Sequence, residues 1–187
     1  MRQLEADPIW VARRDAQARA RLQRELTSQR EQTDLLQDLK ASGVSVNNVW
    51  SLVNTAGPYP GALRVLLDHL SRPYSDRVRE GIARALAVKE ARPVAWDEFV
   101  RLARTEASQS WVSDGVMVAI AAMARPSDLD EIISLITDRL VGPGRVFLVR
   151  NLTRSKKQKA RQVLMDLRDD PDLQREIAAR LKVSIRS

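Results

Sequence analysis

Apolar residues recur every three or four positions along most of the chain, which predicts amphipathic helices rather than strands. The clearest case is residues 60–88, where two apolar stripes flank a turn at residues 71–75. The first stripe holds Leu63, Leu66, Leu67 and Leu70, and the second holds Val78, Ile82, Ala83 and Leu86. Two stripes separated by a short turn predict a pair of antiparallel helices that pack against each other.

The paired pattern recurs three more times toward the C-terminus. Further pairs are expected at residues 96–107 with 111–124, at 129–140 with 145–152, and at 157–168 with 173–181. In each second helix, one apolar position is preceded by two others, three and four residues earlier. The aligned residues are Leu86, Met123, Leu152 and Leu181, with Ile82, Ala119, Leu148 and Ile177 four residues earlier and Ala83, Ile120, Val149 and Ala178 three residues earlier. This repetition predicts about four stacked helical hairpins.

Capping residues stand close to the expected helix starts. Ser75 is placed to cap the helix that holds Val78, and Ser127 with Asp130 matches a capping box. Asp170 followed by Pro171 suits the N-cap and first turn of the last helix.

The N-terminal part has a different pattern. Residues 8–41 contain almost no helix breakers, so one long helix is expected, ending before Gly43. Its apolar residues are sparse around Leu22 and Leu26, whereas Leu35, Leu36 and Leu39 form a denser stripe near its end. The middle of the helix is therefore expected either to be exposed or to pack against another chain.

A short helix is expected at residues 46–54, capped by Ser45, with Val49, Leu52 and Val53 on one side. The chain is thus interpreted as a long, charged N-terminal helix over residues 1–43, followed by a helical-repeat domain over residues 44–187.

Composition narrows the function classes. The chain is 44% hydrophobic and only 4% aromatic, which suits helix packing. It contains no cysteine, so disulfides, thiolate catalysis and cysteine zinc sites are excluded, and a cytoplasmic location is expected. The N-terminus is charged throughout, unlike a secretory signal peptide, and the apolar runs are too short to span a membrane.

Positive charge is concentrated at the C-terminal end. The net charge is +7, and residues 139–187 contain thirteen Lys and Arg against five Asp and Glu. Clustered cations are typical of a surface that binds phosphate or an acidic partner. The alternative interpretation is a set of solvated helix faces.

Residues 71–86, SRPYSDRVREGIARAL, resemble the turn and second helix of a HEAT repeat, and the resemblance extends over residues 60–183. The residues that carry it are Pro73, Asp76, Val78, Arg79, Ala83 and Leu86. Later pairs depart from the pattern, because Arg145 precedes Val146 and the second pair has Gly115 and Val116 without an arginine. The resemblance implies an all-α, short right-handed superhelix of about four hairpins whose concave face, lined by second helices, holds a protein or nucleic acid.

Two groups of basic residues are candidates for binding at such a face. The arginines in or beside second helices are Arg77, Arg84, Arg145, Arg150, Arg175 and Arg180. Lys156, Lys157 and Lys159 open the first helix of the last pair, where cations oppose the helix dipole unless an anion is bound. The alternative interpretation of the lysines is a mobile helix start whose side chains are hydrated, and arginines that do not point into the concave face are expected to be solvated.

Trp111 and Asp114 lie at the start of a second helix and are expected to share a face. This segment is distantly similar to HEAT-like DNA glycosylases that remove alkylated bases, and the similarity implies base excision. The competing interpretation is that Trp111 packs between repeats and Asp114 stabilises the first helical turn.

Other candidate chemistry is weak. His69 is the only histidine, which excludes a metal site built on several histidines, and a helix-dipole contact or solvation is expected for it. The acidic run at residues 169–172 lacks the spacing of a calcium loop. No cofactor and no metal is therefore expected. An exposed cluster of Trp50, Tyr59 and Tyr74 would indicate a protein contact.

The main functional hypothesis is a non-enzymatic scaffold that binds a protein partner through the concave face, with the N-terminal helix docking a partner or a second copy of the chain. The alternative hypothesis is nucleic-acid binding, including base excision, through the basic C-terminal part.

Overall fold

The computed structural model describes residues 8–55, 58–105 and 110–181, and these residues form helices joined by short turns, without a strand. The helices are α1 (Pro8–Glu31), α2 (Thr33–Ala41), α3 (Trp50–Val53), α4 (Ala62–Leu70), α5 (Asp76–Ala85), α6 (Arg92–Thr105), α7 (Trp111–Met123), α8 (Leu129–Thr137), α9 (Val149–Arg154), α10 (Gln158–Asp166) and α11 (Gln174–Leu181). Short 3-10 helices, among them η2 (Lys89–Ala91), η4 (Arg139–Val141) and η5 (Pro143–Leu148), connect them. The all-α prediction is confirmed.

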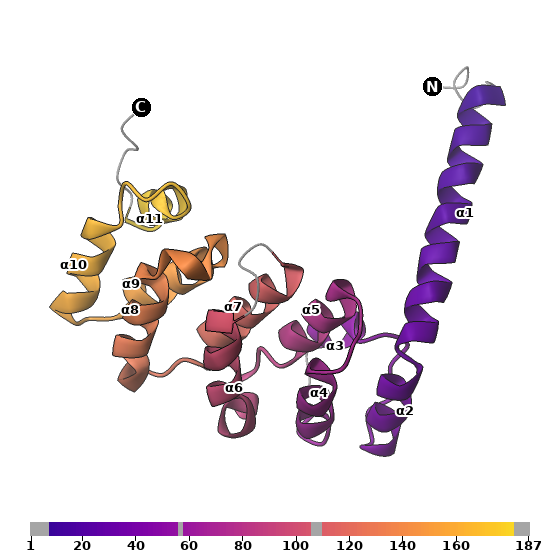
Figure 1. Ribbon diagram of the computed structural model, residues 1–187, viewed down its shortest axis with the longest axis horizontal. Helices are drawn as coiled ribbons and strands as arrows, with labels where there is room; N and C mark the ends of the chain where they lie inside the picture. The colour runs from indigo at the N-terminus through magenta and orange to yellow at the C-terminus, as the bar shows by residue number, and fades with distance from the viewer. Residues whose placement is uncertain (1–7, 56–57, 106–109, 182–187) are drawn as a thin grey trace.

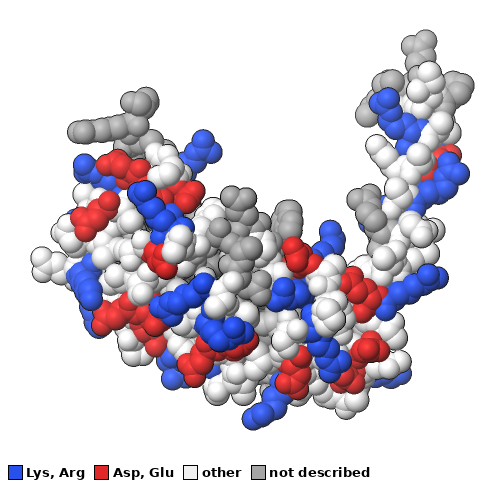
Figure 2. Space-filling view, viewed as in Figure 1, with Lys and Arg blue, Asp and Glu red and all other residues white. Residues whose placement is uncertain are grey.

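The helices lie in two rows. Along one row, α2 contacts α4, α4 contacts α6, and α8 contacts α10. Along the other, α3 contacts α5, α5 contacts α7, α7 contacts η5, and α9 contacts α11. Figure 1 shows the second row on the hollow side of a curved molecule, so we call it the inner row and the first the outer row. Figure 2 shows the same hollow between α1 and α11.

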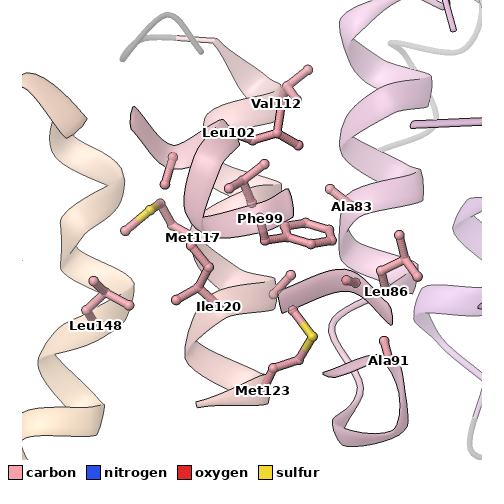
Figure 3. Close-up of a cluster of buried hydrophobic side chains, with 14 of the residues drawn as sticks. Ala83, Leu86, Ala91, Phe99, Leu102, Val112, Met117, Ile120, Met123 and Leu148 are labelled. Carbon is pink, nitrogen blue, oxygen red and sulfur yellow. The ribbon is translucent and has the colours of Figure 1, made fainter. Parts of the chain in front are cut away.

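A continuous apolar core runs between the two rows. Figure 3 shows Phe99 of α6 at its centre, with Ala83 of α5 and Leu86, the residue that follows α5, on one side and Met117 and Ile120 of α7 on the other. The aligned positions of the first three predicted second helices are all buried, as expected from their spacing. Of the aligned positions, Ala178 and Leu181 of α11 are partly exposed, because among the described residues no helix follows α11 in the inner row.

Glycines allow inner-row helices to approach closely. A Cβ added to Gly115 of α7 would lie 2.9 Å from the Cβ of Ala83 and 3.0 Å from the backbone oxygen of Glu80, both on α5. A Cβ added to Gly144 of η5 would lie 3.1 Å from the side chain of Met117. Both glycines stand eight residues before the aligned apolar position, at Met123 and Leu152 respectively, so the close approach repeats from one pair to the next.

The expected single N-terminal helix is two helices in the structure, with Gln32 at the joint. The Gln32 side chain is fully buried, which the helix pattern did not indicate. Its Oε1 accepts a hydrogen bond from the Val49 N–H at 2.8 Å, and its Nε2 donates to the Ser28 carbonyl oxygen at 3.0 Å. These contacts tie the joint to the residue that precedes α3.

The core extends N-terminal of residue 44, the predicted start of the repeat domain. Leu35 and Leu39 of α2 are fully buried in the same cluster as the hairpins. By contrast, α1 projects away from the body in Figure 1, and its Leu22 is 56% exposed. The α2 and α3 helices therefore precede α4 and α5 as a further pair, one helix in each row.

Several predicted helix starts are wrong in detail. Ser45 does not cap α3, which begins at Trp50 after Val49, and Val53 is exposed rather than buried. The capping box before α8 joins Arg125 and Asp128, since the Asp128 carboxylate accepts the Arg125 N–H at 2.6 Å.

Of the two other predicted capping residues, Ser75 makes a tertiary contact and Asp170 makes a local one. Ser75 does occupy the N-cap of α5, but its hydroxyl donates to the Glu31 carboxylate at 2.9 Å instead of capping the helix. Asp170 lies four residues before α11 begins, and it accepts the Asp172 N–H at 3.0 Å.

In the described part of the chain, no helix combines the length and the apolarity needed to cross a bilayer.

Candidate functional site

A groove of about 510 Å³ opens on the inner row between α7, η5, α9 and α11. Its floor is apolar and consists of partly exposed side chains, Val118, Ala121 and Ala122 of α7 with Val146 and Phe147 of η5. Partly exposed apolar groups inside a concavity gain free energy when another molecule covers them. The floor is therefore suited to an apolar group of a ligand.

Helical spacing produces this floor. Val118 and Ala122 are four residues apart on α7, and Ala121 lies between them on the same side, while the opposite side of α7 is buried against α5 and α6. The short side chains of Ala121 and Ala122 leave space above them for a ligand. Asn151 of α9 fixes its far wall, because the Asn151 Nδ2 donates to the Ala121 carbonyl oxygen at 3.0 Å.

The rim of the groove is charged. Arg150 and Arg154 lie one turn apart on α9, and Arg180 lies opposite on α11 beside Glu176. Arg180 Nε contacts the Glu176 carboxylate at 2.7 Å. The guanidiniums of Arg150 and Arg154 are exposed and have no partner among the residues that the structure describes. The rim thus presents more positive than negative charge, with two cations available to a ligand.

Arg145, a predicted binding residue, is buried and cannot reach a ligand. Its Nη2 lies 3.2 Å from Asp170 Oδ1 and 2.8 Å from Asp172 Oδ2. Its Nε and Nη1 donate to the carbonyl oxygens of Gly142 at 2.9 Å and Ile136 at 3.0 Å. Arg145 joins the third pair to the segment before α11. The prediction that Arg145 lies at a binding face is therefore wrong.

Two further predicted arginines of the inner row, Arg77 and Arg84, lie away from the groove. Arg84 of α5 is partly buried, and its Nε donates to the Glu80 carboxylate at 2.7 Å. Arg77 is exposed at the start of α5, where its backbone carbonyl accepts the Trp50 indole N–H at 3.2 Å. The structure therefore does not unite Arg77 and Arg84 with Arg150, although all three lie in the inner row.

The predicted lysines lie at the start of α10 in the outer row. Lys156 and Lys157 are exposed, and Lys159 Nζ contacts the Asp130 carboxylate of α8 at 2.8 Å. This hydrogen bond and the positive charge of Lys159 lower the pKa of the Asp130 carboxyl below its usual value. None of these lysines lines the groove.

The proposed Trp111 and Asp114 pair is only half described. The Trp111 side chain lies outside the described residues. Asp114 is partly exposed on α7, one turn before Val118 and on the same side of the helix. Its carboxylate has no partner in the described part of the chain and lies beyond the edge of the groove.

His69 is buried, and the expectation of a solvated histidine is wrong. Its Nε2 lies 2.9 Å from the Asp38 carboxylate of α2, and its Nδ1 lies 2.7 Å from the Tyr74 hydroxyl. Burial raises the pKa of the Tyr74 hydroxyl. The three side chains connect α2 to the turn between α4 and α5, which is a structural role.

The aromatic residues considered as a contact cluster are each anchored separately. Tyr59 donates its hydroxyl to the Ala85 carbonyl oxygen at 2.7 Å, and burial raises its pKa. Trp50 and Tyr74 make the contacts described above, and all three side chains are partly buried. Within the described residues, no group of three or more His, Asp or Glu side chains is arranged to hold a metal ion.

Sequence reasoning missed most of the groove. Arg154 and Phe147 were not singled out, although Arg154 stands four residues after Arg150 and so shares its helix face. That spacing was the available signal. Comparison of the chain with protein-family models, with curated proteins and with solved structures finds no match. The resemblance to HEAT repeats therefore stays a prediction.

Proposed function

We propose that this chain is a non-enzymatic protein-binding module, a short right-handed HEAT-like superhelix that holds its partner in the groove of the inner row. The observation that carries the proposal is the combination of a partly exposed apolar floor with the guanidiniums of Arg150 and Arg154, which have no partner among the described residues. Interfaces between proteins typically combine an apolar centre with a polar rim, and arginine is enriched in them.

Nucleic-acid binding is the second candidate, and the arginine rim is the observation that favours it. Phosphate groups bind guanidiniums in much the same way as carboxylates do. The two candidates differ in what must lie against Phe147, which is an amino-acid side chain in one case and a base in the other.

A photo-crosslinking experiment distinguishes them. We replace Phe147 by benzoylphenylalanine, and in a control variant we replace Met165, which is 42% exposed on α10 outside the groove. Both variants are irradiated in extracts of the source cell, with and without nuclease. We expect protein adducts that form at position 147, survive nuclease and do not form at position 165. Adducts to nucleic acid alone, or the same proteins at both positions, would contradict the proposal.

A further inference from the structure

The groove is the size of a ligand pocket rather than of a flat protein interface. Its volume of about 510 Å³ lies within the range of about 300–1,000 Å³ that is usual for pockets that enclose a small ligand. Such a space admits a few side chains of an extended or helical segment. A partner that uses this groove must therefore insert a linear segment into it.

The rim selects for negative charge on that segment. Arg150 and Arg154 project from one face of α9, and a guanidinium binds a carboxylate with two parallel hydrogen bonds. Arg180 already has Glu176 as a partner. An arriving carboxylate thus meets two uncompensated cations on one wall, whereas a basic segment would be repelled by them.

The surroundings of the groove disfavour a long polyanion. Asp114 precedes Val118 by one turn on the same side of α7, and its carboxylate has no cationic partner among the described residues. On α5, the Glu80 carboxylate compensates the charge of Arg84. The cations that line the groove therefore lie on α9 and α11. A nucleic-acid strand gains affinity from many successive phosphate contacts, and along this row it would meet a carboxylate after the first few.

We infer that the groove binds an acidic linear segment of a partner protein, with an aliphatic or aromatic anchor on the floor and Asp or Glu side chains against Arg150 and Arg154. This inference rests on the proposed function and adds the chemistry of the partner to it. The anchor loses its contact with water against Val118 and Phe147, and the flanking carboxylates fix its register along α9.

A direct binding measurement tests the inference with the full chain. The probe is a fluorescein-labelled peptide with the sequence Glu-Glu-Leu-Phe-Glu-Asp, followed by fluorescence anisotropy. One control peptide carries Gln and Asn in place of the acids, a second carries Ser-Ser in place of Leu-Phe, and a labelled hexathymidylate represents nucleic acid. The protein variants are Arg150→Gln with Arg154→Gln, and, as a matched control outside the groove, Arg64→Gln with Lys89→Gln, which are exposed on α4 and η2.

We expect the acidic peptide to bind more tightly than either control peptide. The groove variant should raise its Kd about five- to thirtyfold, the change that corresponds to two exposed ion pairs in the upper part of their usual range of strength. The Arg64 and Lys89 variant should change the Kd by no more than about twofold, because it removes two positive charges from positions outside the groove.

Each other outcome overturns the inference in a distinguishable way. If the acidic peptide does not bind, binds no better than the amide peptide or is unaffected by the groove variant, the acidic-segment inference fails, while protein adducts at position 147 still support a protein-binding module. If hexathymidylate binds more tightly than the acidic peptide and the groove variant abolishes this, both the inference and the proposed function fail.

Discussion

At the residue scale, Arg145 shows that the position of an arginine in the sequence does not predict whether its side chain is exposed. Its place beside a second helix predicted an exposed cation, but the structure surrounds its guanidinium with two carboxylates and two carbonyl oxygens. A buried charge is tolerated only when such partners compensate its lost hydration. The partners stand 25 and 27 residues away in the sequence, at Asp170 and Asp172.

Arg145→Met tests this role. The substitution preserves much of the side-chain volume but removes the buried cationic partner of Asp170, itself buried, and leaves it only the exposed Arg139, whose Nε lies 3.6 Å from Asp170 Oδ2. We expect the free energy of unfolding to fall by about 3–5 kcal/mol, the usual cost of breaking a buried pair from one side. Urea denaturation followed by circular dichroism measures it.

Arg150→Met serves as the matched control. Its guanidinium is exposed and has no partner in the described structure, so a change within about 0.5 kcal/mol is expected. Equal destabilisation by the two substitutions would show that the Arg145 contacts contribute nothing specific.

The sequence predicted buried apolar positions well and polar partners poorly. Ile82, Ala119 and Leu148 are buried as their common register requires, because helical periodicity is a local property. His69 and Gln32 are buried through hydrogen bonds to residues far along the chain, and no local pattern encodes such pairs. In the groove, Arg150 was predicted as a binding residue, but its neighbours across the groove depend on how α9 packs on α7 and α11.

At the element scale, the apolar pattern located the helices of the four predicted hairpins but not all their ends. The predicted helix at residues 145–152 begins as η5 and becomes α-helical only at Val149. Gly144 lies in this 3-10 segment and packs closely on Met117. The close approach of η5 to α7 is what brings Phe147 beside Val118 in the groove.

Gly115→Ala tests whether close approach stabilises the inner row. In an open helix this change is stabilising by about 0.5–1 kcal/mol, because glycine loses more backbone entropy on folding. Here the added methyl would lie 2.9 Å from the Ala83 Cβ and 3.0 Å from the Glu80 backbone oxygen. We therefore expect the opposite sign, a net loss of about 1 kcal/mol or more from overpacking.

The thermal unfolding midpoint decides between the two signs. Ala122→Val is the control on the same helix, since this residue faces the open groove and should tolerate added volume within about 0.5 kcal/mol. A midpoint that rises on Gly115→Ala would mean that α5 and α7 are less tightly packed than described.

At the scale of the whole molecule, each helix pair contacts mainly its neighbours along the two rows. Within the described residues, the first and the last pair therefore have a neighbouring pair on one side only. The α2 and α3 helices supply the cover for α4 and α5. The sequence did not reveal this pair as a repeat, because α3 has only four residues and cannot display the register of the other second helices.

Two truncations test where the stable body begins. A chain starting at Ser28 lacks most of α1 but keeps the Gln32 contacts, so its unfolding midpoint should match that of the full chain. A chain starting at Val44 also loses Leu35 and Leu39, two fully buried leucines worth about 1.5–3 kcal/mol each. Circular dichroism melts compare the three proteins. Equal stability of both truncations would support the sequence-based prediction that the stable domain begins at residue 44.

Because α1 projects from the body, a small change in its tilt moves its N-terminal end by a large distance. With 24 residues it is about 36 Å long at the usual rise of an α-helix. A tilt of only about 10° at Gln32 would displace its far tip by about 6 Å over that reach. The Gln32 side chain also accepts the Val49 N–H, so a change in the tilt of α1 would act on the residue that precedes α3, where the inner row begins.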